Sequence, residues 1–98
     1  MSLKKIEKYI EILLHLHSHE NTTINHIVNK FDITYSTVRS LFKKWIKDKY
    51  ISKVKIKGVK AGEPQYTYHL TNQGIDYLSN LTLKLNEEIN KLNKKIAK

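Results

Sequence analysis

The chain has 98 residues, no cysteine and a formal net charge of +9. Without cysteine it can form no disulfides and no thiolate metal site, and no apolar run approaches the roughly 20 residues of a membrane-spanning helix. We therefore expect one small intracellular domain in the cytoplasm, with or without an appendage. Its positive charge points to nucleic acid or an anionic membrane surface, and we expect it to lie with the nucleoid.

Residues 2–17 predict an amphipathic helix. Its apolar positions fall on one helical stripe: Leu3, Ile6, Tyr9, Ile10, Leu13, Leu14 and His17. Ile12 lies off this stripe, so we expect it to be exposed on an isolated domain and free to meet a second copy. His15, His17 and His19 alternate in the same segment, but helical residues two apart point in different directions. We therefore expect no metal site there.

A short second helix is expected after the polar loop 18–22. Thr23 is a suitable N-cap, and apolar residues follow at helical spacing: Ile24, Ile27, Val28 and Phe31. Asp32 and Ile33 then form a tight connection. Thr34 is expected to cap the third helix, so the two helices form a closely spaced pair.

The helix predicted for residues 35–49 has one apolar and one basic face. Val38, Leu41, Phe42 and Trp45 fall within about 100° of arc. The other side carries hydroxyls, the single arginine and lysines, which suit base edges and phosphates in a major groove: Tyr35, Ser36, Thr37, Arg39, Ser40, Lys43, Lys44 and Lys47. The alternative is an ordinary solvated face.

A basic β-ribbon is expected next. Residues 53–57 alternate between lysine and an apolar residue, which predicts a half-buried strand with its lysines outward. Gly58 and Gly62 bracket the turn, and Pro64 begins the return strand. Three lysines are expected to contact phosphates: Lys55, Lys57 and Lys60. Residues 39–60 carry nine basic side chains and one acidic one, a net +8. Alternatively, the lysines only protect a strand edge from aggregation.

The last helix, which Thr71 is expected to cap, has a heptad pattern. Its apolar spacing alternates between three and four residues up to Ile96. Because an isolated helical tail is marginal in water, we expect it to pair with a second copy through Leu78, Leu81, Leu85, Ile89, Leu92 and Ile96, with Ile12 beside them. With such pairing, residues 1–72 would be the main domain and 73–98 the dimerisation helix, with the pairing direction left open. The alternative is a solvated tail that frays.

The order of these elements resembles the winged helix-turn-helix fold, over about residues 3–81. TTINHIVNKFDITYSTVRSLFKKWIKDKYI resembles its paired helices. YTYHLTNQGIDYL resembles the return strand and the Leu-Thr-x-x-Gly-x-x-x-Leu entry to the last helix, common in MarR-like, PadR-like and small archaeal regulators. The resemblance implies an α+β, mostly α fold. It also implies that helix 35–49 enters the major groove and that the wing, 57–63, touches the backbone or minor groove.

The leading hypothesis is a sequence-specific, double-stranded DNA-binding homodimer, most simply a transcription regulator. No nucleophile motif or paired carboxylates indicate an enzyme, and no cofactor or metal is expected. Two alternatives stay open. One is an architectural, largely non-specific DNA-binding protein, which the seventeen-to-one excess of lysine over arginine favours. The other is a winged-helix module for protein interaction or RNA binding. The sequence identifies no small-molecule effector.

Overall fold

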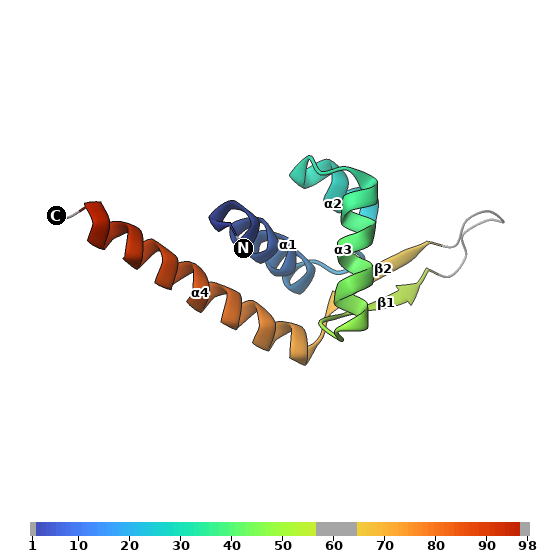
Figure 1. Cartoon of the computed structure of the whole chain (residues 1–98). Helices are drawn as coiled ribbons and strands as arrows, with labels where there is room; N and C mark the ends of the chain where they lie inside the picture. Colours follow the sequence, from blue (N-terminus) through green and yellow to red (C-terminus); the bar gives the residue numbers. More distant parts are fainter. Residues whose placement is uncertain (1, 57–64, 97–98) are drawn as a thin grey trace.

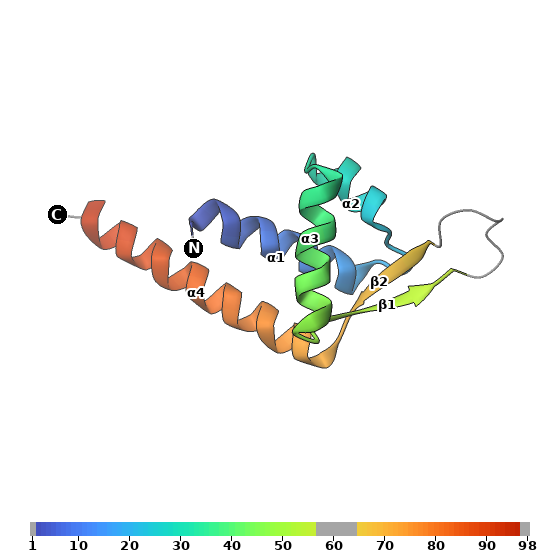
Figure 2. The ribbon, with the colours of Figure 1, turned by 45° about the vertical axis from the view of Figure 1, so that its right-hand side comes forward.

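The computed structural model describes residues 2–56 and 65–96. These residues form four helices and two strands: α1 (Leu3–Ser18), α2 (Ile24–Phe31), α3 (Tyr35–Lys47), β1 (Ile51–Lys55), β2 (Tyr66–Leu70) and α4 (Asn72–Ile96). Helix α1 lies between α4 and the α2–α3 pair, and the ribbon and the C-terminal end of α4 lie at opposite ends of the molecule (Figures 1 and 2). The molecule measures 62 × 27 × 21 Å, so it is elongated along α4.

Side-chain caps set where three of the helices begin. The hydroxyl of Ser2 accepts a hydrogen bond from the amide of Lys5, and Thr23 accepts one from His26. Thr71 accepts one from the amide of Gly74, so the predicted caps at Thr23 and Thr71 are confirmed. Thr34 occupies the N-cap position of α3, but it makes no side-chain bond to a backbone amide.

The connections around α3 use left-handed backbone. Asp32, with φ of 52°, ends α2 and turns the chain into α3. At the other end α3 stops at Lys47, two residues before the predicted boundary, and Lys49 adopts φ of 65°. These two turns direct the chain out of α2 and into β1 within a few residues.

One core joins all the elements, and Trp45 lies at its centre. Its side chain is 1% exposed. Its ring packs edge-on against Tyr9 of α1 at a centroid distance of 5.5 Å, and it lies 6.5 Å from Tyr77 of α4. Phe42 contributes a third neighbour at 5.9 Å and in turn contacts Tyr68 of β2 at 4.8 Å. Burial of these rings contributes much of the hydrophobic stabilisation of a domain this small.

The prediction that Ile12 is exposed is wrong. Ile12 is fully buried, whereas Leu14, expected on the inner stripe, is 46% exposed. The buried arc of α1 is rotated toward Ile12 and His15 because α1 packs between elements that are distant in sequence. Ile12 is therefore a core residue and is not available to a second copy.

Strands β1 and β2 form the expected hairpin, but the face that packs inward is not the one that the sequence predicted. Strands β1 and β2 are antiparallel, with Lys53 opposite Tyr68 and Val54 opposite Thr67. Val54, expected to be half-buried, is 54% exposed. Lys53 and Lys55 are exposed, as predicted, but they share the ribbon face of Tyr66 and Tyr68. The lysines therefore lie on the side of the ribbon that meets α3.

Three histidines form a stack that the sequence did not indicate. The ring of His15 lies 3.9 Å from that of His19 and 4.9 Å from that of His26. His15 is buried, and its Nε2 has no hydrogen-bond partner among the described residues. Burial, and then the charges of His19, His26 and Lys30, lower the pKa of His15. In the described ranges no three side chains of metal-binding type are arranged to hold a metal ion.

Across residues 2–56 and 65–96, no helix combines the length and the apolar character that crossing a membrane requires.

The histidine stack should make the folded protein less stable in acid. The folded-state pKa of His15 lies below its unfolded value of about 6.5. On acidification the unfolded chain therefore binds more protons than the folded one, and the free energy of unfolding decreases as the pH is lowered. Thermal unfolding midpoints should therefore drop between about pH 7.5 and pH 5.5. In His15→Phe this drop should be smaller, whereas the exposed His17→Asn should keep the wild-type slope. Equal slopes in all three proteins would contradict the assignment.

The packing at the start of α4 leaves no room for a side chain at Gly74. A Cβ atom there would overlap the carbonyl oxygen of Tyr50 and the side chain of Leu70. Gly74→Ala should therefore lower the free energy of unfolding by roughly 1–3 kcal/mol, measured by denaturant titration of Trp45 fluorescence. Ser79→Ala, on the exposed side of α4, should stay within about 0.5 kcal/mol of wild type. An unchanged stability in Gly74→Ala would show that the helix start can shift freely.

Candidate nucleic-acid interface

The rotation of α3 exposes its polar-basic face. Val38, Phe42 and Trp45 are at most 1% exposed and hold α3 against the core. All eight residues that the sequence assigned to the other side are exposed: Tyr35, Ser36, Thr37, Arg39, Ser40, Lys43, Lys44 and Lys47. Because α3 is amphipathic, burial of its apolar stripe is sufficient to orient this face outward.

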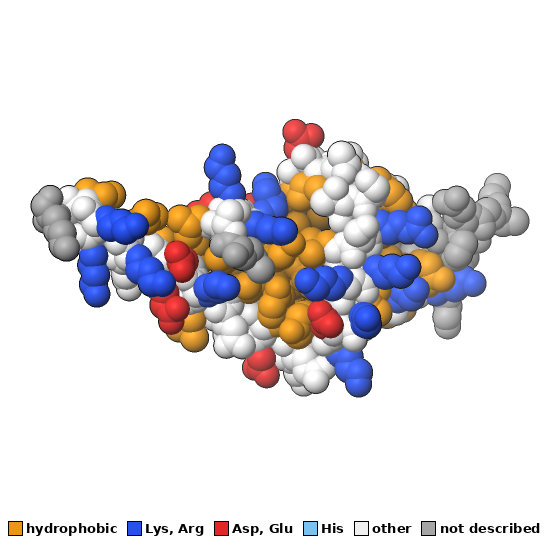
Figure 3. All heavy atoms as spheres, in the orientation of Figure 1, with side chains coloured by type: hydrophobic (Ala, Val, Ile, Leu, Met, Phe, Trp, Pro, Cys, Tyr) orange, Lys and Arg blue, Asp and Glu red, His pale blue; other side chains and the backbone are white. Residues whose placement is uncertain are grey.

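A basic groove lies between α3 and the ribbon. Its cavity volume is about 560 Å³, and its cationic lining residues are Arg39, Lys43 and Lys53. Two aromatic side chains, Tyr35 and Tyr66, line the same groove. In the space-filling view, lysine and arginine side chains gather over α3 and the adjoining ribbon (Figure 3). We refer to this surface as the α3–ribbon groove.

Tyr66 holds one of these cations in place. The ammonium of Lys53 lies 4.7 Å from the centre of the Tyr66 ring. Such cation–π contacts restrict a flexible lysine without neutralising its charge. Lys55 lies directly opposite Tyr66 and continues the basic face along the ribbon. Lys57 and Lys60, also assigned to this surface from sequence, lie outside the described residues.

The structure divides the predicted set between two sides of α3. Arg39 and Lys43 face the ribbon, whereas Ser36, Ser40 and Lys44 line a second groove between α1 and α3. Lys47 is exposed and lines neither groove. The sequence placed these residues on one continuous face because a helical wheel does not show which neighbouring element lies on each side.

Among residues 2–56 and 65–96, no acidic residue lines either groove. Within the part of the chain that the structure describes, ion pairs join Lys8 to Glu11 and Lys91 to Glu88, and none involves α3 or the ribbon. Burial raises the pKa of the Tyr68 phenol at the base of the α3–ribbon groove, so this group stays neutral. The described part of this surface therefore carries positive charge that no ion pair neutralises, which suits a polyanion.

Tyr66 is a member of this surface that the sequence did not assign, and Lys53 is one for which the sequence left phosphate contact and edge protection both open. The exposure of Lys53 was expected, but its position beside Arg39 and Lys43 depends on strand register and on how the ribbon packs against α3. The alternation of the strand could show that Lys53 and Lys55 share a face, but not that this face borders α3.

Known proteins resemble the chain in structure. No protein-family model and no curated protein matches its sequence. A PadR-like transcription factor from Bacteroides fragilis matches with a TM-score of 0.76 and 24% identity, over 93% of this chain and 90% of that one. A PadR family transcriptional regulator from Eggerthella lenta matches with a TM-score of 0.81 and 15% identity, over 96% and 85% of the two chains.

A third structure contains DNA. MepR of Staphylococcus aureus, in a MepR–DNA complex, matches with a TM-score of 0.70 and 18% identity, over 97% of this chain and 65% of that one. These similarities confirm the expected winged helix-turn-helix fold, α+β and mostly α, with a long C-terminal helix. At such identities they establish the fold of the chain and leave its function to be argued from the surface.

Proposed function

We propose that the chain is a homodimeric, sequence-specific double-stranded DNA-binding protein that regulates transcription. The observation that carries the proposal is the uncompensated cationic surface formed by α3 and the ribbon. The complex of MepR with DNA supports it, since that protein shares the fold. In this proposal α3 enters the major groove, and the ribbon follows the adjoining backbone or minor groove.

The dimensions and side chains of α3 fit a major groove. Its 13 residues span about 20 Å, and small hydroxyl side chains, Ser36, Thr37 and Ser40, occupy the outward positions of its first turns. Small side chains allow the helix axis to approach the base pairs. Arg39, the single arginine, is then the side chain best able to make a bidentate contact with guanine.

The ribbon supplies phosphate contacts. Lys53 and Lys55 lie on the face that adjoins α3, so both can reach the backbone flanking the groove that α3 enters. We propose that Lys57 and Lys60 extend these contacts along the wing. Lysines neutralise phosphates without reading base identity, so this part contributes affinity rather than specificity.

The second half of α4 provides the proposed dimer interface. Ile89, Leu92 and Ile96 are 39%, 44% and 79% exposed, at heptad positions. Leu78 and Leu85, which are half-buried against the core, continue the same stripe. Leu81 is 4% exposed and, like Ile12, belongs to the core, so we remove both from the proposed interface. Pairing of residues 73–98 would place two α3 helices on successive half-sites.

The second candidate is an architectural, non-specific DNA-binding protein, which the excess of lysine over arginine favours. Fluorescence anisotropy with random duplex, single strand and a selected duplex, at two salt concentrations, separates the candidates. The regulator requires a selected-to-random affinity ratio above about 10³. Equal affinity for all duplexes would favour the architectural role, and the absence of duplex binding at low salt would exclude both.

Arg39 and Lys53 should contribute differently to binding. Arg39→Ala should reduce the preference for the selected duplex by about 1–3 kcal/mol, because it removes a base contact. Lys53→Ala should weaken binding to all duplexes alike and lower the salt slope by about 0.9. Lys91→Ala, on α4, is the control and should bind as wild type. Equal, sequence-independent losses in the first two variants would contradict the role of Arg39 as a base reader.

The tail of α4 should determine oligomeric state. Ile89→Lys or Leu92→Lys places a charge on the exposed apolar stripe and should give a monomer in sedimentation experiments. Asn90→Lys adds the same charge beside the stripe and should leave the dimer intact. A dimer that persists in both stripe variants would refute this interface.

A further inference from the structure

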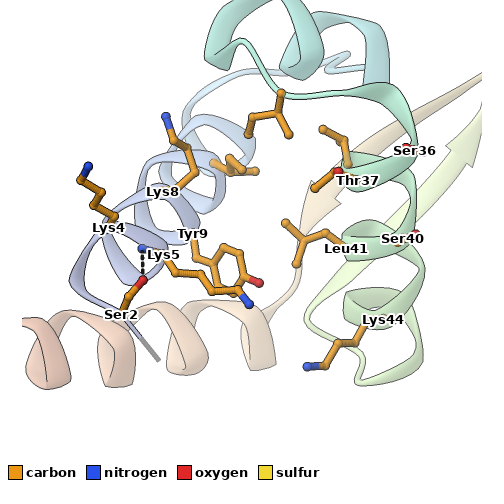
Figure 4. Close-up of a pocket in the computed structure, with 13 residues that line it drawn as sticks. Ser2, Lys4, Lys5, Lys8, Tyr9, Ser36, Thr37, Ser40, Leu41 and Lys44 are labelled. Carbon is orange, nitrogen blue, oxygen red and sulfur yellow. Dashed lines mark hydrogen bonds between the residues drawn. The ribbon is translucent and has the colours of Figure 1, made fainter.

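A second groove, between α1 and α3, is larger than the α3–ribbon groove. Its cavity volume is about 780 Å³, within the range typical of small-molecule sites. Figure 4 shows it bounded by α1 on one side and α3 on the other, with the ring of Tyr9 between them. In Figure 3 the same region is an apolar patch with lysines around its edge. We refer to it as the α1–α3 groove.

Two ammonium groups point into one end of this groove. Lys5 extends from α1 past the Tyr9 ring, 6.0 Å from its centre, and Lys44 extends from α3 toward Lys5 (Figure 4). In the part of the chain that the structure describes, no acidic side chain lines the groove and neither lysine is in an ion pair. Two exposed cations that extend toward one another favour an anionic group between them.

The floor of the groove is apolar and elongated, and its rim carries two further lysines and four hydroxyls: Lys4, Lys8, Ser2, Ser36, Thr37 and Ser40. Tyr9, Ile33 and Leu41 are partly exposed along it, and Val38 and Ile12 close its base. Its α3 residues run from position 36 to position 44, a length of about 12 Å along the helix. A linear chain therefore fits this groove, with its charged end at Lys5 and Lys44.

We propose that the α1–α3 groove binds a linear amphipathic anion: a medium-chain acyl group that ends in a carboxylate or phosphate. The head group lies between Lys5 and Lys44, and the chain runs along Tyr9 and Leu41 toward Ile33. Charge complementarity selects this occupant over the α4 tail of a second copy, because residues 82–98 carry five lysines and two glutamates and would be repelled. A bare phosphate would leave the apolar floor uncovered.

Occupancy of this groove would oppose DNA binding, a consequence that rests on the proposed function. Ser36, Ser40 and Lys44 belong both to the groove and to the exposed face of α3. A bound anion would neutralise Lys44 and add negative charge beside the phosphate backbone. The acyl anion would therefore act as a negative effector.

Titration with decanoate, below its micelle concentration, tests the site directly. Trp45 is the single tryptophan and packs against Tyr9, so its emission should change saturably. Octanoate, two methylenes shorter, should bind about tenfold more weakly. The Lys5→Gln/Lys44→Gln variant should lose about tenfold or more in decanoate affinity, whereas Lys91→Gln should be unchanged. Circular dichroism confirms that each variant is folded.

Three results would overturn the site: no saturable response, equal decanoate affinity in the double variant, or binding of uncharged 1-octanol as tight as that of octanoate. A variant Lys5→Gln that loses duplex affinity but keeps decanoate affinity would also overturn it, and would assign Lys5 to the DNA interface. These measurements need no DNA for their primary readout, so failure of the proposed function would leave the anion site standing. If both hold, decanoate should release the protein from its duplex.

Discussion

Burial of Val38, Phe42 and Trp45 fixes the rotation of α3 about its own axis, and the exposed chemistry of the protein depends on that rotation. Phe42 packs against the Tyr68 ring of β2, and Trp45 packs against Tyr9 of α1 and Tyr77 of α4. With that stripe inward, Arg39 and the hydroxyls can only face solvent. Turning α3 by one residue, about 100°, would bury polar groups without partners and expose the aromatic core. A helix held in this way is a rigid platform for a partner.

Because α1 and the ribbon lie on opposite sides of α3, one helix borders two different grooves. The α3–ribbon groove combines Arg39 and Lys43 with Lys53 and is suited to a phosphate backbone. The α1–α3 groove combines Lys44 and Lys5 with an apolar floor and is suited to an amphipathic anion. Both occupants would use charges on the same helix, so binding of one would weaken the other. This coupling needs no conformational change, only competing electrostatics.

Local patterns in the sequence were sufficient for much of the fold. The caps at Thr23 and Thr71 and the two faces of α3 follow from short-range rules. The buried position of Ile12 could not be predicted, because it depends on which distant elements enclose α1. The prediction of the ribbon's inner face failed for a similar reason. Alternation defines two faces, but the pairing register places Lys53 opposite Tyr68, and packing against α3 makes that face the inner one.

Whether the exposed face of α3 lies on DNA can be tested by mapping duplex binding onto the backbone amides of ¹⁵N-labelled protein by NMR. We expect the largest shift changes within Tyr35–Lys47 and Ile51–Lys55. We expect little change in the last turns of α4, around Leu92. Shift changes confined to α4, or absent from α3 under conditions where the duplex is bound, would show that this face does not lie on DNA.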